Sequence, residues 1–271
     1  MKGQEIREQE LILEVKNLDK SFGKIQALLK VNLKVYAGQV LAIVGDNGAG
    51  KTTFIKLLSG VLEPDQGEII VNSETFKKMS PSISLKKGIS TVYQDLALID
   101  CRDVACNLFL GREPVIGKFF VNKRKMLKHS RALLESLKIK IPQLDVDVGK
   151  LSGGQRQGIA VARAILQGGK LIIFDEPTAA MGVKESTKVL SLIRNLAERG
   201  FGIIVISHNL HQVFEISHRI CVMRQGHLVE DFITKDTNPD EVVGCITGVN
   251  KYYEVNTDEH NSTEDFQEAS C

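Results

Sequence analysis

Near the N-terminus, a glycine-rich run has the residue types and spacing needed to hold a phosphate group. It fits the pattern G-x-x-x-x-G-K-[ST] and reads Gly45-Asp46-Asn47-Gly48-Ala49-Gly50-Lys51-Thr52. An apolar run at residues 40–44 precedes it and a helical pattern at 53–58 follows it, so it joins a predicted strand to a predicted helix. Glycines let backbone N–H groups turn toward an anion, and the helix N-terminus adds a positive dipole end. Lys51 is then expected to reach the β- and γ-phosphates, and Thr52 to bind Mg²⁺.

Two carboxylates stand directly after a second apolar run. Residues 171–174 are apolar and are followed by Asp175 and Glu176. If residues 171–175 form a strand of a parallel sheet, both carboxylates lie at the edge where such sheets bind ligands. Asp175 is then placed to hold the hydration shell of Mg²⁺, and Glu176 to act as a general base on an attacking water.

A third segment supplies a second phosphate-binding device. Residues 151–157 read Leu-Ser-Gly-Gly-Gln-Arg-Gln and precede another helical pattern. Ser152 is expected to cap that helix, while Gly153 and Gly154 leave its first amides open to an anion. One nucleotide does not need two such devices in one subunit. The sequence therefore indicates action across a dimer.

The elements that must position these segments are expected to form an α/β fold. Strands are predicted at residues 11–15, 31–35 and 67–71, as a small antiparallel unit, and at 88–93, 171–175 and 202–206. A helical pattern extends through about residues 96–166, with Lys125, Lys128 and Arg131 on a solvated helix face. Because strands and helices alternate in the core, its sheet is expected to be mostly parallel.

Bulk composition argues against several classes of protein. The 271 residues carry a formal net charge of +2, which indicates no general affinity for nucleic acid. No apolar stretch approaches the roughly 20 residues of a membrane-spanning helix, and the polar N-terminus lacks the apolar region of a signal peptide. The chain is therefore expected in the cytosol. Five cysteines without C-x-x-C spacing argue for reduced thiols, and His208 and His211, although they could share a helix face, lack a carboxylate spaced to complete a metal site.

Taken together, these motifs resemble those of ATP-binding-cassette (ABC) ATPases, in that family's order. Residues 45–52 resemble the Walker A motif, 151–155 match the LSGGQ signature, and 171–176 resemble the Walker B motif. The resemblance covers about residues 10–235. It implies an α/β fold with a RecA-like P-loop NTPase core, a small antiparallel β subdomain and an α-helical subdomain.

The resemblance also implies a division of the chain and a set of ligand contacts. The expected parts are an N-terminal extension at 1–10, a nucleotide-binding core with the antiparallel β subdomain at 11–94, an α-helical subdomain with the signature at 95–166, the second part of the core at 167–249 and an acidic polar tail at 250–271. The residues expected to contact ATP are Phe22, Gly45, Asp46, Asn47, Gly48, Ala49, Gly50, Lys51, Thr52, Thr53, Ser152, Gly153, Gly154 and Gln155. The residues expected to hold Mg²⁺ are Thr52, Gln94 and Asp175, and those expected to be catalytic are Glu176, His208, Gln94 and Lys51.

Within the family, two cassettes sandwich two ATP molecules. The resemblance therefore implies a second cassette subunit, with a homodimer favoured, and transmembrane permease subunits that move when the pair closes. Each nucleotide would lie between the phosphate loop of one subunit and residues 152–154 of the other. The chain would then sit at the cytoplasmic face of the plasma membrane, held there by the permease, with no nucleic acid partner.

Finer resemblances suggest what is transported. Residues 107–113 and 176–183 resemble cassettes of bacterial sugar importers of the ribose/xylose/fructose type, which implies an extracytoplasmic sugar-binding protein as an indirect partner. The detached ATPase of an exporter or lipid transporter shares every catalytic motif and stays open as an alternative. A cassette ATPase working on nucleic acid or ribosomes is disfavoured, because too few residues separate Lys51 from Ser152 for a coiled-coil insertion. A nucleotide kinase would not need residues 151–157.

Two residues depart from the family pattern. Phe22 replaces the usual tyrosine at the adenine-stacking position, and it keeps the π-face while losing only the hydroxyl. Gly182 stands where the D-loop usually has aspartate, so the cross-dimer contacts that this loop normally makes do not carry over.

Overall fold

The computed structural model describes residues 10–117, 119–179 and 181–249 of the chain. The predicted acidic tail at 250–271 and nearly all of the predicted N-terminal extension at 1–10 therefore lie outside the described residues, as does Ala180 beside the D-loop glycine.

A six-stranded sheet in the order β12-β11-β3-β10-β9-β6 forms the centre of the fold. Its strands are β3 (Val40–Val44), β6 (Ile89–Val92), β9 (Leu171–Asp175), β10 (Gly202–Ile206), β11 (Arg219–Arg224) and β12 (His227–Ile233). All neighbours run parallel except β12, which pairs antiparallel with β11. Every residue of β3 and β10 is buried, as expected for strands covered on both faces, and this explains their unbroken apolar sequence. The predicted parallel core is confirmed.

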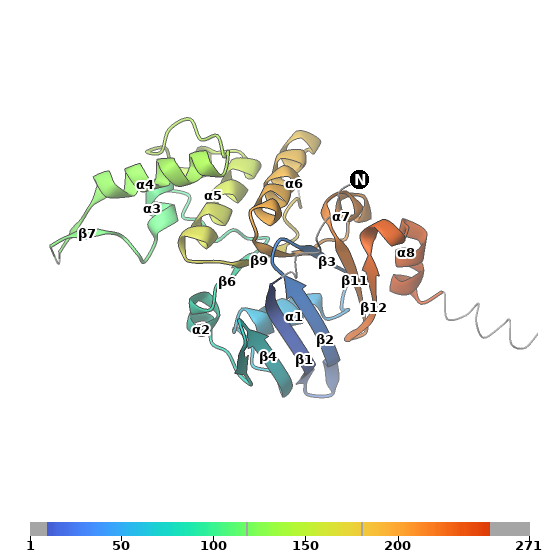
Figure 1. The fold of residues 1–271 in the computed structure, drawn as a ribbon. Coiled ribbons are helices and arrows are strands. Elements are labelled where there is room, and N and C mark those ends of the chain that lie inside the picture. The colour runs from blue at the N-terminus through green and yellow to red at the C-terminus, as the bar shows by residue number, and fades with distance from the viewer. Residues whose placement is uncertain (1–9, 118, 180, 250–271) are drawn as a thin grey trace, which may run out of the picture.

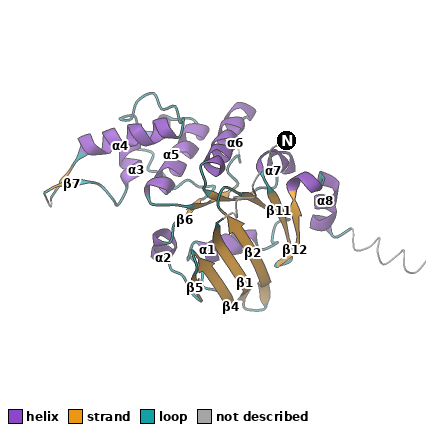
Figure 2. Cartoon of the chain, viewed as in Figure 1, coloured by secondary structure: helices purple, strands orange, loops and turns teal. Residues whose placement is uncertain are grey.

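Different elements cover the two faces of this sheet (Figures 1 and 2). Because successive side chains of a strand alternate between faces, Leu41 and Ile43 pack with α1 (Lys51–Leu58) and the antiparallel strands, whereas Val40 packs with helices. Those helices are α5 (Gly153–Leu166) and α6 (Val183–Glu198). Near β11, α7 (Leu210–Ile216) and α8 (Pro239–Thr247) close a third, smaller core.

A four-stranded antiparallel sheet lies beside α1, in the order β2-β1-β4-β5. Its strands are β1 (Leu11–Phe22), β2 (Ile25–Tyr36), β4 (Gln66–Val71) and β5 (Glu74–Phe76), and the short helix α2 (Pro81–Lys86) follows it. The predicted small antiparallel unit is thus present. Its first two strands are longer than predicted, because register shifts between them let the ladder continue past the region of alternating burial.

The predicted helical region contains three helices and an unpredicted hairpin. The helices are α3 (Val104–Phe109), α4 (Lys123–Ser136) and α5, with short 3₁₀ turns at Val148–Lys150 and, much later, Thr234–Asp236. Between α3 and α4, β7 (Val115–Ile116) pairs with β8 (Phe120–Val121), a hairpin that the helical pattern did not indicate. Pro114 cannot donate a helical hydrogen bond, and Gly117 turns at a φ of 63°. Lys125, Lys128 and Arg131 lie on the exposed face of α4, as predicted.

The three helices lie within the predicted α-helical subdomain at 95–166, although the domain limits themselves stay predictions. Across residues 10–249, gaps at 118 and 180 aside, no helix combines the length and apolar character that a membrane crossing requires. The cysteines in this range that the structure places, Cys101, Cys106, Cys221 and Cys245, form no disulfide.

Candidate nucleotide-binding site

The glycine-rich run joins the end of β3 to the start of α1, as the sequence predicts. Gly45 has a φ of +150° and Gly50 a φ of +104°, and a Cβ on either residue would collide with backbone. The Cβ would lie 2.1 Å from the Met223 carbonyl oxygen at the first position and 2.6 Å from the Ala27 carbonyl oxygen at the second. The loop can therefore take this path only with glycine at both positions.

The start of α1 is open to an anion. Gly50 at its N-cap provides no side-chain hydrogen bond, and the first turn contains no acidic residue. The amides of the first turn have no partner within the helix, and the helix dipole places partial positive charge there. Thr52 is exposed and Thr53 is half-buried at this end. Asp46, Asn47 and Gly48 form the exposed outer part of the loop, while Ala49 is buried beneath it.

Lys51 folds back over the loop that precedes it. Its Nζ donates hydrogen bonds to the carbonyl oxygens of Gly45, at 2.6 Å, and Asp46, at 2.8 Å. Burial lowers the pKa of Lys51, although the carboxylates of Glu176, Asp46 and Asp175 oppose that shift. The ammonium group is thus held at the centre of the loop within the field of both carboxylates that follow β9.

Asp175 is the last residue of β9 and lies level with Ile206 at the end of the neighbouring strand β10. Its pKa is raised, first by burial and then by the adjacent charge of Glu176, while Lys51 and Lys56 act in the opposite direction. Because β10 also pairs in parallel with β3, the carboxylates and the phosphate loop leave the same edge of the sheet. The structure thereby brings together the first two chemical segments found in the sequence.

Glu176 has an unusual backbone and a specific partner. Its φ is 50°, a left-handed conformation that costs about 1–2 kcal/mol for a residue with a Cβ. The backbone N–H donates to the Ile206 carbonyl oxygen at 2.9 Å, which holds this turn against the end of β10. The Glu176 Oε1 lies 2.9 Å from the His208 Nδ1. The Glu176 side chain is 18% exposed and that of His208 is 77% exposed. The carboxylate is therefore largely shielded from solvent, whereas its imidazole partner is in contact with solvent.

His208 stands before α7 rather than on it. The helix begins at Leu210 and is capped by the Asn209 side chain, so the possibility that His208 and His211 share one helix face is not realised. Within the described segments, no group of three or more histidine, cysteine or acidic side chains is arranged to hold a metal.

Gln94 follows β6 and is exposed. With Glu176 it lines a cavity of about 250 Å³, whose wall is completed by the start of α5, including Gly153 and Gln157. Sequence reasoning did not identify Gln157. The residue is 2% exposed, and within the described segments its Nε2 has no hydrogen-bond partner. A glutamine within the apolar pattern of α5 was the available signal.

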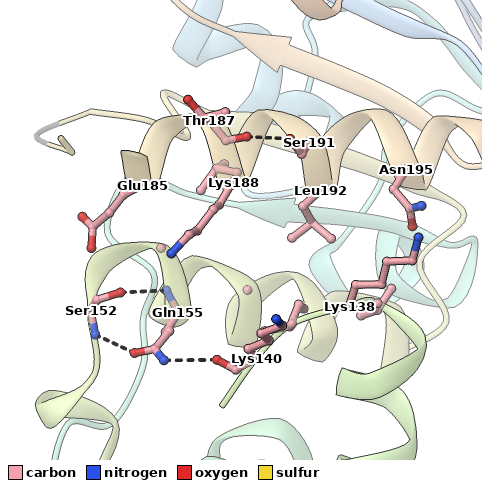
Figure 3. Close-up of a pocket in the computed structure, with 15 residues that line it drawn as sticks. Lys138, Lys140, Ser152, Gln155, Glu185, Thr187, Lys188, Ser191, Leu192 and Asn195 are labelled. Atoms are coloured by element: carbon pink, nitrogen blue, oxygen red, sulfur yellow. Dashed lines mark hydrogen bonds between the residues drawn. The ribbon is translucent and has the colours of Figure 1, made fainter. Parts of the chain in front are cut away.

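The signature segment forms the capped start of α5 (Figure 3). The Gln155 backbone N–H donates to the Ser152 Oγ at 3.4 Å, and the Ser152 N–H donates to the Gln155 Oε1 at 3.1 Å, which together form a capping box. The predicted cap at Ser152 is confirmed. The Gln155 Nε2 also donates to the Lys140 carbonyl oxygen at 3.1 Å, so this side chain anchors the helix start. The amides of Gly153 and Gly154 remain at the open end.

The start of α5 borders two spaces: Gly153 lines the cavity beside Gln94 and Glu176, whereas its neighbours line a separate cleft. Ser152, Gly154 and Gln155 line a space of about 910 Å³ between α5 and α6, with Glu185 and Lys188 across it (Figure 3). Among the described residues, no hydrogen bond joins the signature segment to the phosphate loop.

Phe22 and Gly182 are the two residues that depart from the family pattern, and the structure places both at the ends of elements. Phe22 ends β1 and is 47% exposed, with the Lys20 Nζ 5.6 Å from its ring centroid. Gly182 is the N-cap of α6 and provides no side-chain hydrogen bond. Its φ of −70° suits any residue, and a Cβ there would meet nothing within 4 Å. The glycine is thus not required by the local backbone.

Comparison with known proteins shows extensive similarity. The family model described as "ABC transporter" matches residues 28–179. The xylose/arabinose import ATP-binding protein of Sulfolobus acidocaldarius is 44% identical over 236 residues, which cover 87% of this chain and 94% of that protein. The fructose import ATP-binding protein of Rhizobium meliloti is 44% identical over 247 residues, covering 89% and 95%. The ribose import ATP-binding protein of Yersinia pestis is 35% identical, and the match covers 88% of this chain but 46% of that protein.

Solved structures agree in fold. A nucleotide-free ATP-binding cassette from an ABC transporter superposes with a TM-score of 0.77 at 26% identity, covering 87% of this chain and 98% of that one. A cassette in its ADP conformation gives a TM-score of 0.77 at 27% identity, covering 88% and 99%. The predicted fold, a P-loop core with a small antiparallel sheet and a helical segment, is confirmed by these similarities.

Proposed function

Since the chain belongs to the ABC transporter family, we propose that it is the ATP-hydrolysing subunit that powers sugar uptake through a separate membrane permease. The chain is an ATPase of the ABC type. The observation that carries the proposal is the shared sheet edge, where Lys51, Asp175 and Glu176 lie beside the open start of α1. Sugar as the cargo is supported by two relatives that match this chain over nearly their whole length and are named as sugar import proteins.

The triphosphate would be held by the phosphate loop. Lys51 would exchange its bonds to the loop carbonyls for bonds to the β- and γ-phosphates, and the amides of α1 would bind the remaining oxygens. Phe22 offers an exposed ring on which adenine can stack. The loop residues Gly45–Thr53 would surround the phosphates.

The side chains near Asp175 suit Mg²⁺. The Thr52 hydroxyl, the Gln94 amide oxygen and the Asp175 carboxylate are hard oxygen donors, which this ion prefers. Burial beside Glu176 raises the pKa of Asp175, so a nearby cation would relieve an existing electrostatic cost. Bound there with the nucleotide, Mg²⁺ would neutralise charge on the phosphate oxygens.

Glu176 is the proposed general base. Its carboxylate lies at the sheet edge within hydrogen-bond distance of His208, so the imidazole can orient it and can contact a γ-phosphate brought to the same edge. The left-handed backbone turn at Glu176 directs the side chain away from the strand line. Strained backbone of this kind persists where the surroundings hold it, here through the bond to Ile206.

A second copy of the chain would complete the site. Ser152 and Gly154 of the signature segment line the cleft between α5 and α6, and no hydrogen bond among the described residues joins this segment to the chain's own phosphate loop, which suits a nucleotide held by a twin subunit. In this arrangement the pair attaches to the permease at the cytoplasmic face of the membrane, and an extracytoplasmic sugar-binding protein delivers the cargo. The exporter or lipid-transporter alternative is not favoured, because the relatives described above are import proteins.

Reconstitution tests the proposal directly. The chain, purified with its permease and placed in vesicles with ATP and Mg²⁺, should drive uptake of a labelled pentose or hexose. The permease assembled with the Lys51→Ala variant should show no uptake, and this complex serves as the matched control. Export of a lipid or drug by the wild-type complex, or ATP hydrolysis with no movement of any sugar supplied, would show that the cargo assignment is wrong.

A further inference from the structure

The hairpin β7–β8 carries an exposed apolar cluster. The exposed fraction is 86% for Phe119 and 75% for Phe120, and Val115, Ile116 and Val121 are each more than half exposed. Figure 1 shows β7 at the outer end of α4, away from the six-stranded sheet. Exposed apolar clusters of this kind, bordered by charge, mark surfaces that meet a partner or a membrane.

The sequence around this cluster is strongly cationic. Positions 114–134 contain six lysine or arginine residues and no aspartate or glutamate, whereas the whole chain has a net charge of only +2. Lys123 forms an ion pair with Asp103 at 3.4 Å. Among the described residues, Arg124, Lys125, Lys128 and Arg131 form none, and all four lie on the exposed side of α4.

These cations do not serve the helix that carries them. Lys123, Arg124 and Lys125 occupy the first turn of α4, where the helix dipole is positive and each cation costs roughly 0.3–1 kcal/mol. Asn122 already caps the helix, because its side chain accepts a hydrogen bond from the Lys125 N–H at 3.0 Å. The opposite side of α4, with Met126 and Leu134, is buried in the core. A charge arrangement that opposes helix stability indicates a use outside the helix.

We propose that the hairpin tip and the exposed basic side of α4 form a membrane-surface contact for anionic phospholipid headgroups. Phe119 and Phe120 would enter the boundary between headgroups and acyl chains, and the neighbouring cations would attract the lipid phosphates. An exposed apolar tip beside positive side chains without ion-pair partners suits the surface of an anionic bilayer, which offers both acyl chains and phosphates. The hairpin base is closed by the Asn122 N–H, which donates to the Pro114 carbonyl oxygen at 2.7 Å, so the tip is presented on an ordered support.

Vesicle sedimentation with the full-length chain tests this contact, without permease or nucleotide. Wild-type protein should bind vesicles that contain phosphatidylglycerol and bind pure phosphatidylcholine at least about tenfold more weakly. Salt near 1 M, where the Debye length is about 3 Å, should remove most of the difference. Phe119→Ser/Phe120→Ser and Lys125→Glu/Lys128→Glu should each lower the affinity for anionic vesicles about tenfold or more.

Matched controls use exposed residues far along the chain from the hairpin. Ile233→Ser and Lys77→Glu/Lys235→Glu should bind anionic vesicles as the wild type does. Retained ATP binding and circular dichroism would show that the hairpin variants are folded. The proposal is overturned if wild-type protein ignores phosphatidylglycerol or if the hairpin variants bind it normally. It is also overturned if a separate pull-down shows that those variants no longer retain the permease although they bind anionic vesicles normally, because the partner is then a protein. None of these results bears on the proposed sugar uptake.

Discussion

Replacing Glu176 with glutamine separates chemistry from binding at the proposed site. Glutamine keeps the Cβ and the side-chain length, so the left-handed backbone at φ 50° and the N–H bond to Ile206 should persist. The amide can still contact the His208 imidazole, but it cannot accept a proton from water. General-base catalysis contributes typically 10²–10⁴-fold, so turnover should fall by that factor, or about 2.7–5.4 kcal/mol of barrier.

The same substitution has predictable electrostatic effects. The charge of Glu176 raises the pKa of Asp175 and also opposes the lowered pKa of Lys51. Its removal should therefore let both pKa values fall. Neutralising one carboxylate at the sheet edge also reduces repulsion of a triphosphate, so ATP affinity should be retained or increased.

Two measurements decide the matter for Glu176→Gln. Phosphate release with Mg²⁺ and ATP should drop at least about a hundredfold, while the dissociation constant of a fluorescent ATP analogue stays equal or decreases. Glu198→Gln, at the exposed C-terminal end of α6, is the matched control and should change neither value. Turnover within about threefold of wild type, at intact affinity, would refute the assignment of Glu176 as base.

Three further predictions concern the other parts of the site. Lys51→Ala should weaken nucleotide binding at least about tenfold in a titration, because the half-buried cation over the loop is lost. Ser152→Arg should leave ATP binding to one chain intact, yet Glu176→Gln/Ser152→Arg should elute as a monomer with ATP where Glu176→Gln elutes as a dimer; a persisting dimer would contradict the cross-subunit role. Asp175→Asn should raise the free energy of unfolding without nucleotide at pH 7, because a carboxyl whose folded-state pKa is raised favours unfolding when ionised. That gain should disappear as the pH falls through the raised pKa toward 3.8, the ordinary value. Urea denaturation at several pH values measures it, and a lower free energy of unfolding for Asp175→Asn at pH 7 would contradict the prediction.

Local patterns in the sequence were sufficient for much of the fold. β3, β9 and β10 are short apolar runs with turn residues or carboxylates at their ends, and such runs have few alternatives to a buried strand. The phosphate loop was equally evident, because Gly45, Gly48 and Gly50 adopt positive φ values that favour glycine, and this requirement is visible in the sequence. The cap at Ser152 followed from one side chain and the helix next to it.

The hairpin β7–β8 could not be predicted in this way. Each of its strands has two residues, and all four residues are exposed, so neither length nor alternating burial gave a signal. Its formation depends on Pro114 and Gly117 interrupting a region whose surroundings are helical. β1 and β2 were underestimated for a related reason, because their outer halves are held by cross-strand pairing rather than by burial of alternate residues.

The electrostatic character of the site depends on strand order, which no single segment encodes. Lys51 and His208 follow β3 and β10, whereas Asp175 ends β9, and the three residues meet because β10 lies between β3 and β9. Only that order lets the Glu176 carboxylate reach His208 and also influence the pKa of Lys51. The pKa of Lys51 is lowered and that of Asp175 is raised, in each case mainly by burial, so both ionised groups are costly before a ligand arrives. The triphosphate and Mg²⁺ proposed to bind here would carry both charges needed to offset those costs, so this sheet edge suits a charged ligand better than it stabilises the fold.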